Sequence, residues 1–156
     1  MAANQTYVDN VIARCTGILG DFRMPVCVDI IRRERPNLSR QDIEKIIKRY
    51  RQHVEFWNGD IKVIENELNQ FATATGLSFD YVAQVYNDMR FVGIYKYDCI
   101  TGISAWQSAL NQNGIENKIQ AGRSSGKCYL LVRLNQYQLA TSLLNLYGVL
   151  PIEDFF

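Results

Sequence analysis

The chain has 156 residues, of which 47% are apolar and 21% charged, and its net charge at pH 7 is +1. This composition can fill a hydrophobic core without metals or disulfides, and it predicts that no long segment of the chain is disordered. Because no apolar run approaches the roughly 18 residues of a membrane span, and residues 1–9 lack the features of a signal peptide, we expect a cytoplasmic protein with no membrane partner.

The first 90 residues carry the apolar periodicity of about five amphipathic helices. Pro36 must end the second helix, because proline cannot continue a helical hydrogen-bond ladder. Ser39 followed by Asp42 resembles a capping box and predicts the start of the third helix. The expected helices span residues 6–19, 25–35, 40–57, 61–75 and about 79–89.

After Arg90 the pattern changes to β-branched and aromatic runs that alternate with helical stripes. The expected order is β-α-β-β-α, with strands at 91–97, 115–121 and 128–134 and helices at 101–113 and 137–147. This half loosely resembles a ferredoxin-like open sandwich. We therefore predict an α+β fold with a helical lobe (1–90) and a small α/β lobe (91–156). Since no flexible linker separates them, we expect the lobes to form one compact unit.

Basic residues concentrate in residues 32–53, where eight Lys and Arg face three Asp and Glu, a net charge of +5. Residues 54–90 carry −4. On a helix, the basic residues would line a face about 20 Å long, which could bind nucleic acid or an acidic protein. The alternative is an ordinary solvated face. The candidate nucleic-acid-binding residues here are Arg32, Arg33, Arg35, Arg40, Lys45, Lys48, Arg49 and Arg51.

Residues 70–86 resemble the helix-turn-helix of DNA-binding proteins. Ala72 is small where two helices would cross, and Gly76 allows the positive φ of the turn. The resemblance implies that the second helix presents Gln84 and Asn87, whose amides can read adenine. Acidic residues on both helices oppose DNA binding, so two packed structural helices are the alternative. Residues 26–53 form a second possible helix-turn-helix with the favourable charge.

We expect no enzyme activity, no metal site and no cofactor. His53 is the chain's one histidine, and nothing in the sequence places a nucleophile such as Cys99 beside it. The four cysteines lack metal-binding spacing and are expected to be reduced and mostly buried. Residues 122–127 lack the spacing of a phosphate-binding loop and are expected to join two strands.

The segment 149–156 is unusually apolar, and its Leu150, Ile152, Phe155 and Phe156 either pack on the sheet or insert into a partner, including a second copy in a homodimer. Trp57 and Trp106 are expected to anchor the core. Two functions follow as hypotheses. One is a nucleic-acid-binding protein, such as a small transcriptional regulator. The alternative is a protein-binding inhibitor or adaptor that uses opposed charge patches and the apolar segment.

Overall fold

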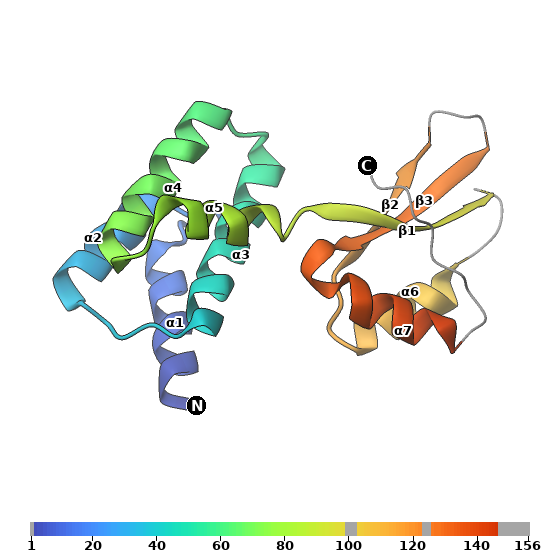
Figure 1. Ribbon diagram of the computed structural model, residues 1–156, viewed down its shortest axis with the longest axis horizontal. Coiled ribbons are helices and arrows are strands. Elements are labelled where there is room, and N and C mark those ends of the chain that lie inside the picture. Colours follow the sequence, from blue (N-terminus) through green and yellow to red (C-terminus); the bar gives the residue numbers. More distant parts are fainter. Residues whose placement is uncertain (1, 99–102, 123–125, 147–156) are drawn as a thin grey trace. The chain divides into compact units, whose positions relative to one another are not determined.

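The computed structural model describes residues 2–98, 103–122 and 126–146, with side chains from Tyr7 onward. Helices come first and a small sheet with further helices follows, so the predicted α+β class is confirmed (Figure 1). The chain divides into two compact units, Met1–Asn87 and Asp88–Phe156. We call them the helical unit and the sheet unit and describe each by itself.

The helical unit contains five helices whose apolar stripes meet in one core. Helix α2 packs on α1 and α4, while α3 packs on α1 and α5. Ile46, Ile47 and Phe71 are fully buried between them. The helices are α1 (Ala2–Cys15), α2 (Met24–Glu34), α3 (Arg40–Trp57), α4 (Ile61–Thr75) and α5 (Phe79–Asn87).

Local capping sets the ends of the central helices. The Ser39 hydroxyl accepts a hydrogen bond from the Asp42 amide at 3.2 Å, and the Asp42 carboxylate accepts one from the Ser39 amide at 2.9 Å. This reciprocal pair is the predicted capping box of α3. Asn58 and Gly76 end α3 and α4 in the left-handed conformation, with φ of 53° and 75°.

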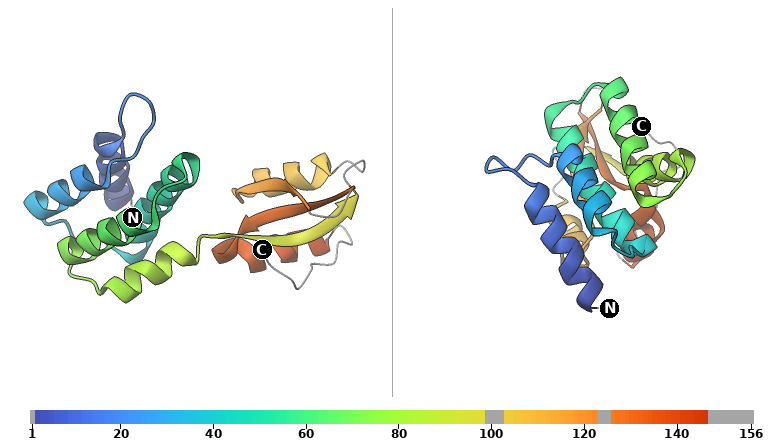
Figure 2. Two further views of the ribbon diagram at one scale, coloured as in Figure 1. Left: turned by 90° about the horizontal axis from the view of Figure 1, so that it is seen from above. Right: turned by 90° about the vertical axis from the view of Figure 1, so that its left-hand side faces the viewer.

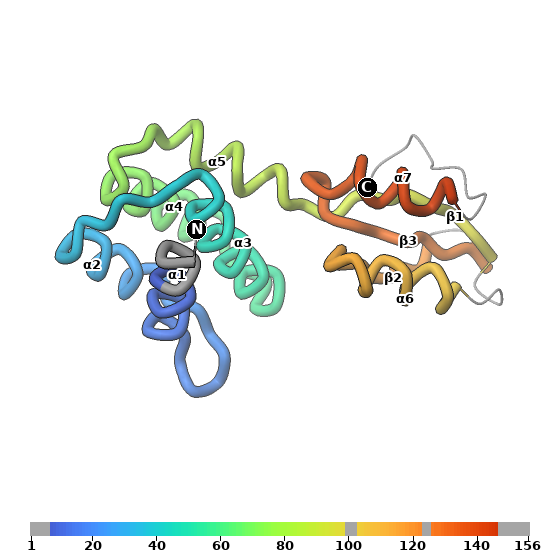
Figure 3. The backbone as a smooth tube through the Cα atoms, turned by 90° about the horizontal axis from the view of Figure 1, so that it is seen from below, coloured from blue at the N-terminus to red at the C-terminus, as the bar shows by residue number. Residues whose placement is uncertain are grey.

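The end of α1 differs from the prediction. The helix stops at Cys15, and residues 16–23 form a loop that projects from the unit (Figures 2 and 3). Thr16 and Phe22 form an isolated β-bridge at its base, and Gly20 has a φ of 83°. The expected extension to Leu19 is wrong because two glycines favour the turn over another helical turn, although Ile18 and Leu19 fit the helical spacing.

The sheet unit has the predicted β-α-β-β-α order. Its antiparallel strands lie in the order β1-β3-β2, with an irregularity in β1 between Gly93 and Tyr95. Helices α6 and α7 cover the same face of the sheet (Figure 1), and Leu110, Leu130 and Ala140 pack in the core between. The elements are β1 (Phe91–Asp98), α6 (Ser104–Gln112), β2 (Asn117–Ala121), β3 (Lys127–Arg133), a 3-10 turn (Leu134–Gln136) and α7 (Tyr137–Asn145).

The cysteines only partly match expectation. Cys15 and Cys27 are free and buried, as predicted. Cys128 in β3 is disulfide-bonded, so the prediction of reduced thiols is wrong there. Sequence spacing could not show this bond, because the path of the chain decides which cysteines meet. Among the described residues, no helix is both long and apolar enough to cross a bilayer.

Candidate functional site

The clearest exposed feature of the helical unit is a group of apolar side chains at the C-terminal end of α3. Nine large apolar side chains are exposed among the described residues, and five of them line neighbouring hollows here. We call these five the α3-end patch: Ile18, Leu19, Phe56, Trp57 and Val63. Leu19 is 87%, Phe56 78% and Trp57 56% exposed. Monomeric proteins rarely expose such groups without a binding role.

Trp57 is therefore not the core anchor that the sequence suggested. Helix α3 is 18 residues long, and its last turn extends past the buried stripe that ends at Tyr50. Phe56 and Trp57 lie edge to face on this turn, with ring centroids 5.1 Å apart. Trp106 does match expectation, since it packs against the core of the sheet unit and meets Tyr95 edge to face at 4.8 Å.

Beside the patch lies a mostly apolar groove of about 400 Å³. Its walls come from the start of α2, the second half of α3 and the first half of α4. A smaller hollow of about 210 Å³, lined by Leu19 and Phe56, shares His53 and Trp57 with the groove. The surface thus combines projecting aromatic side chains with adjacent hollows.

The acidic residues that line the groove are engaged within the unit. Asp60 caps α4 by accepting from the Lys62 amide at 2.8 Å, and Glu67 accepts from the Tyr50 hydroxyl at 2.8 Å. In contrast, the exposed Arg23 side chain has no hydrogen bond or ion pair with any residue that the structure describes. The groove therefore presents an exposed arginine beside two carboxylates that keep their negative charge.

Arg49 and His53 lie in the wall of the smaller hollow. Arg49 donates to the Gly20 carbonyl at 2.5 Å and so holds the projecting loop. Burial lowers the pKa of His53 below its ordinary value of 6.5; Asp21 opposes this shift and Arg49 adds to it. The surroundings of His53 therefore favour the neutral form of the imidazole.

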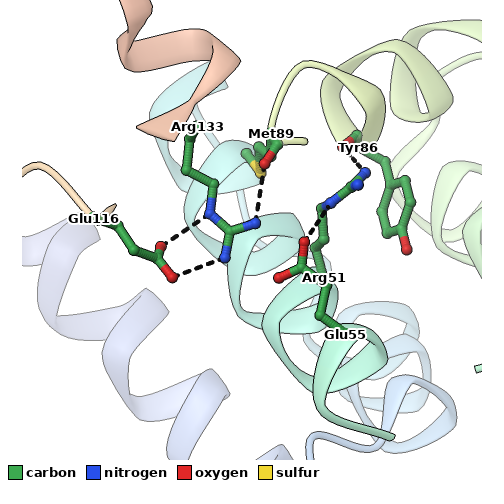
Figure 4. Close-up of polar contacts among 6 residues, drawn as sticks. All are labelled: Arg51, Glu55, Tyr86, Met89, Glu116 and Arg133. Carbon is green, nitrogen blue, oxygen red and sulfur yellow. Dashed lines mark hydrogen bonds and ion pairs between the residues drawn. The ribbon is translucent and has the colours of Figure 1, made fainter. Parts of the chain in front are cut away.

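Arg51, a predicted nucleic-acid contact, is used inside the helical unit. Its side chain is only 16% exposed. The guanidinium donates to Glu55 at 3.0 Å and to the Tyr86 carbonyl at 2.8 Å, and it lies 4.5 Å from the centre of the Tyr86 ring (Figure 4). These contacts join α3 to α5. Arg51 therefore has a structural role whether or not the unit also binds an anion.

Most of the other predicted basic residues also have partners. Lys45 forms an ion pair with Asp9 of α1 at 2.5 Å, and Arg40 forms one with Glu44 at 3.3 Å. Arg33 donates to the Asp29 carbonyl at 3.4 Å, and Lys48 is likewise engaged. Arg32 and Arg35 are different, because their side chains are exposed and form no ion pair or hydrogen bond with the described part of the chain.

The structure brings together the turns of the two predicted helix-turn-helix segments. A pocket of about 450 Å³ is lined by the α2–α3 turn, with Arg35 and Arg40, and by the α4–α5 turn, with Thr75. Sequence reasoning did not foresee this meeting, because it depends on the packing of α2 against α4. Gln84 and Asn87 are exposed on α5, but neither lines the pocket.

In the sheet unit, one buried cation holds several segments together. Arg133 is 1% exposed, and its guanidinium forms two hydrogen bonds of 2.9 Å with the Glu116 carboxylate (Figure 4). It also donates to the Met89 carbonyl at 3.0 Å and lies 4.1 Å from the centre of the Phe91 ring. A guanidinium engaged in this way is a structural element.

Within the described residues, no three His, Cys, Asp or Glu side chains are grouped as metal ligands would be. The predicted partner-binding residues Leu150, Ile152, Phe155 and Phe156 lie outside the described residues. Neither the protein-family models, nor the curated proteins, nor the solved structures compared with this chain gave a match.

Proposed function

We propose that the chain is a non-catalytic protein-binding module, whose helical unit holds an amphipathic helix of a partner protein, with a carboxylate beside Arg23, in the groove beside Trp57. The observation that carries this proposal is the coincidence of the α3-end patch with two adjoining hollows. Exposed aromatic side chains next to apolar hollows are typical of the centres of protein interfaces.

The groove is suited to a helix because its apolar lining comes from three helical segments. A bound amphipathic helix would place its apolar side chains along Val54, Val63 and Ile64, with Trp57 at the edge. This is the helix-in-groove mode of recognition, in which side chains one helical turn apart serve as anchors.

Arg23 favours a partner carboxylate at one place along the groove. Asp60 and Glu67 already accept hydrogen bonds within the unit, whereas Arg23 is exposed. A carboxylate on the partner helix would pair with Arg23, whereas a lysine at the same place would be repelled by it.

A designed peptide pair tests the proposal. One labelled peptide is an amphipathic helix with Leu and Phe on one face and Glu on the other, and its match carries Lys in place of Glu. Fluorescence anisotropy with the full chain should show binding of the acidic peptide, weakened more than about 10-fold by Trp57→Ala, since a central aromatic residue contributes strongly to binding. Leu139→Ala, at an exposed apolar residue of the sheet unit, is the control and should change nothing. Equal binding of both peptides, or undiminished binding to the Trp57 variant, would refute the proposal.

Nucleic-acid binding is the second candidate, favoured by the exposed Arg35, which lines the pocket where the two turns meet, and by Arg32, which is exposed three residues earlier on α2. A labelled duplex should then bind with an affinity that falls steeply between about 50 and 200 mM salt, because binding releases counterions from phosphates. Changing both arginines to Glu should abolish binding, while Lys118→Glu on the sheet unit should preserve it. Absence of binding at the lower salt concentration would exclude this function, including the role of a small transcriptional regulator.

The homodimer and the cytoplasmic location stay predictions. Light scattering of the full chain, and of a variant ending at Leu146, would show whether residues 147–156 promote self-association. The disulfide at Cys128 does not favour the cytosol, where thiols are kept reduced. Fractionation of cells would decide the location.

A further inference from the structure

The pocket between the α2–α3 and α4–α5 turns has the size of a small-molecule site. Its volume of about 450 Å³ lies within the range of about 300–1,000 Å³ that such sites occupy. Ile31 and Ile43, which are 3% and 4% exposed, and Leu77 give it apolar walls. It shares no lining residue with the groove beside Trp57. A ligand that fills this pocket therefore needs an apolar or aromatic body.

The charge on the wall of this pocket is positive. Among the residues that the structure describes, Arg35 and Arg40 are the charged ones that line it. Asp42 and Asp80 lie in the first turns of α3 and α5 without lining the pocket. Arg40 pairs with Glu44 at 3.3 Å, but its side chain is 75% exposed, and such a surface pair contributes little to stability. Both guanidinium groups can therefore bind an anion at small cost.

The backbone of Arg35 gives a second reason to assign this side chain to a ligand. Arg35 ends α2 in the left-handed conformation, with φ of 48° and ψ of 52°. Glycine adopts this conformation without strain, whereas a residue with a Cβ atom does not. Local backbone strain of this kind is typical of residues with a binding role. The side chain so placed lines the pocket and forms no hydrogen bond or ion pair with any residue that the structure describes.

We propose that this pocket binds a small organic phosphate, whose phosphate group pairs with Arg35 and Arg40 and whose aromatic or apolar body lies against Ile31, Ile43 and Leu77. A phosphate monoester carries a charge of about −1.5 to −2 at pH 7, which matches two arginines better than a carboxylate does. A guanidinium can donate two parallel hydrogen bonds to phosphate oxygens, and so fixes the orientation of the ligand.

The shape of the pocket favours a free small molecule over nucleic acid. A DNA duplex presents its phosphates on a convex surface, with the bases stacked inside. A concave pocket with apolar walls instead fits a molecule that carries an apolar body directly beside its phosphate. The proposal is also independent of the helix-binding groove, since the two sites have no lining residue in common.

NMR titration of the full chain with 1-naphthyl phosphate tests the proposal. We expect amide shifts confined to the α2–α3 and α4–α5 turns, with a dissociation constant on the order of 0.1–1 mM for a ligand of this size. Two matched probes separate the parts of the ligand: 1-naphthol lacks the phosphate, and inorganic phosphate lacks the ring. Each should bind at least about 10-fold more weakly than 1-naphthyl phosphate, because each loses one set of contacts.

Variants of two exposed arginines assign the phosphate contact. Arg35→Gln should weaken binding of 1-naphthyl phosphate at least about 10-fold, because it removes charge-assisted hydrogen bonds. Arg32→Gln is the matched control, since Arg32 is exposed on the same helix without lining the pocket, and it should leave the dissociation constant unchanged. Arg35→Gly should also lose binding, yet unfold at the same temperature as the wild type or higher, because glycine relieves the strained φ.

Four results would overturn the proposal. They are equal binding of 1-naphthol, shifts centred on the groove beside Trp57, an equal loss of affinity in Arg32→Gln, and displacement of 1-naphthyl phosphate by a short DNA duplex at lower concentration. The last result would assign the arginines to nucleic acid. The three probes on the wild-type chain decide the matter even if a variant fails to fold. None of these results bears on the helix-binding groove, which the designed peptides test separately.

Discussion

Replacing Glu116 with alanine should destabilise the sheet unit by about 2–4 kcal/mol. The change removes both hydrogen bonds of 2.9 Å from the Arg133 guanidinium, which is 1% exposed. Removing one partner of a buried ion pair typically costs about 3–5 kcal/mol, because the other charge stays buried without compensation. Glu116 is itself 32% exposed, so water replaces part of the lost contact, and the Met89 carbonyl still accepts from Arg133. Both effects lower the expected cost.

Urea denaturation with a fluorescence signal from the sheet unit alone would measure this cost. The chain has two tryptophans, and each unit contains one. In a Trp57→Phe background, Trp106 reports on the sheet unit by itself. A loss of this size should move the urea midpoint down by roughly 1–2 M, given the usual dependence of stability on urea for small units.

A double variant supplies the control. Changing Arg133 to Met together with Glu116→Ala removes the buried charge as well as its partner. This double variant should recover most of the stability, since well-packed apolar side chains often replace a buried ion pair without loss. A single variant that costs less than about 0.5 kcal/mol, or a double variant no better than the single one, would refute the argument from uncompensated burial.

Three further predictions concern the helical unit. The NMR signal of the single imidazole, His53, should titrate with a pKa below 6.5. The stability that the neutral ring contributes is complete above the pKa of histidine in the unfolded chain and is lost as the pH falls. A pKa above 6.5 would contradict the burial of the ring. Burial and a hydrogen bond to Glu34 raise the pKa of Tyr7 to about 12. An ultraviolet titration, with Tyr7→Phe as the reference, should show ionisation of Tyr7 near that value. In Glu34→Gln, the pKa of Tyr7 should lie closer to the ordinary value of 10.0. Gly76→Ala should cost about 1 kcal/mol in thermal or urea unfolding because φ is +75°, whereas Gly59→Ala, a control without positive φ, should cost clearly less.

The order of the elements could be predicted because its signals are local. The capping box at Ser39, the stop at Pro36 and the positive φ at Gly76 depend only on neighbouring residues, and the structure contains all three, since α2 ends at Glu34. The alternation between helical and strand periodicity after Arg90 likewise needed no tertiary information. These features gave the α+β class and the β-α-β-β-α order.

The candidate site could not be predicted, because exposure depends on which neighbour an apolar residue finds. Leu19 and Trp57 continue apolar stripes in the sequence, yet the loop and the overhanging turn of α3 leave both exposed. Arg51 and Arg133 are the opposite case, in which charged residues that the sequence would place in solvent have partners within the fold. Each was one cation among many in the sequence, and only the packed structure places a carboxylate, a carbonyl and an aromatic ring around each guanidinium.

The strand order also has a consequence for how the chain folds as it is synthesised. Among the described strands β1 pairs only with β3, which is the last strand to be made, whereas β2 and β3 are joined directly. While the ribosome synthesises α6 and β2, both edges of β1 are therefore unpaired. A strand in this state can pair with other chains. The irregularity after Gly93 and the exposed charges of Lys96 and Asp98 make β1 a poor template for such pairing during that interval.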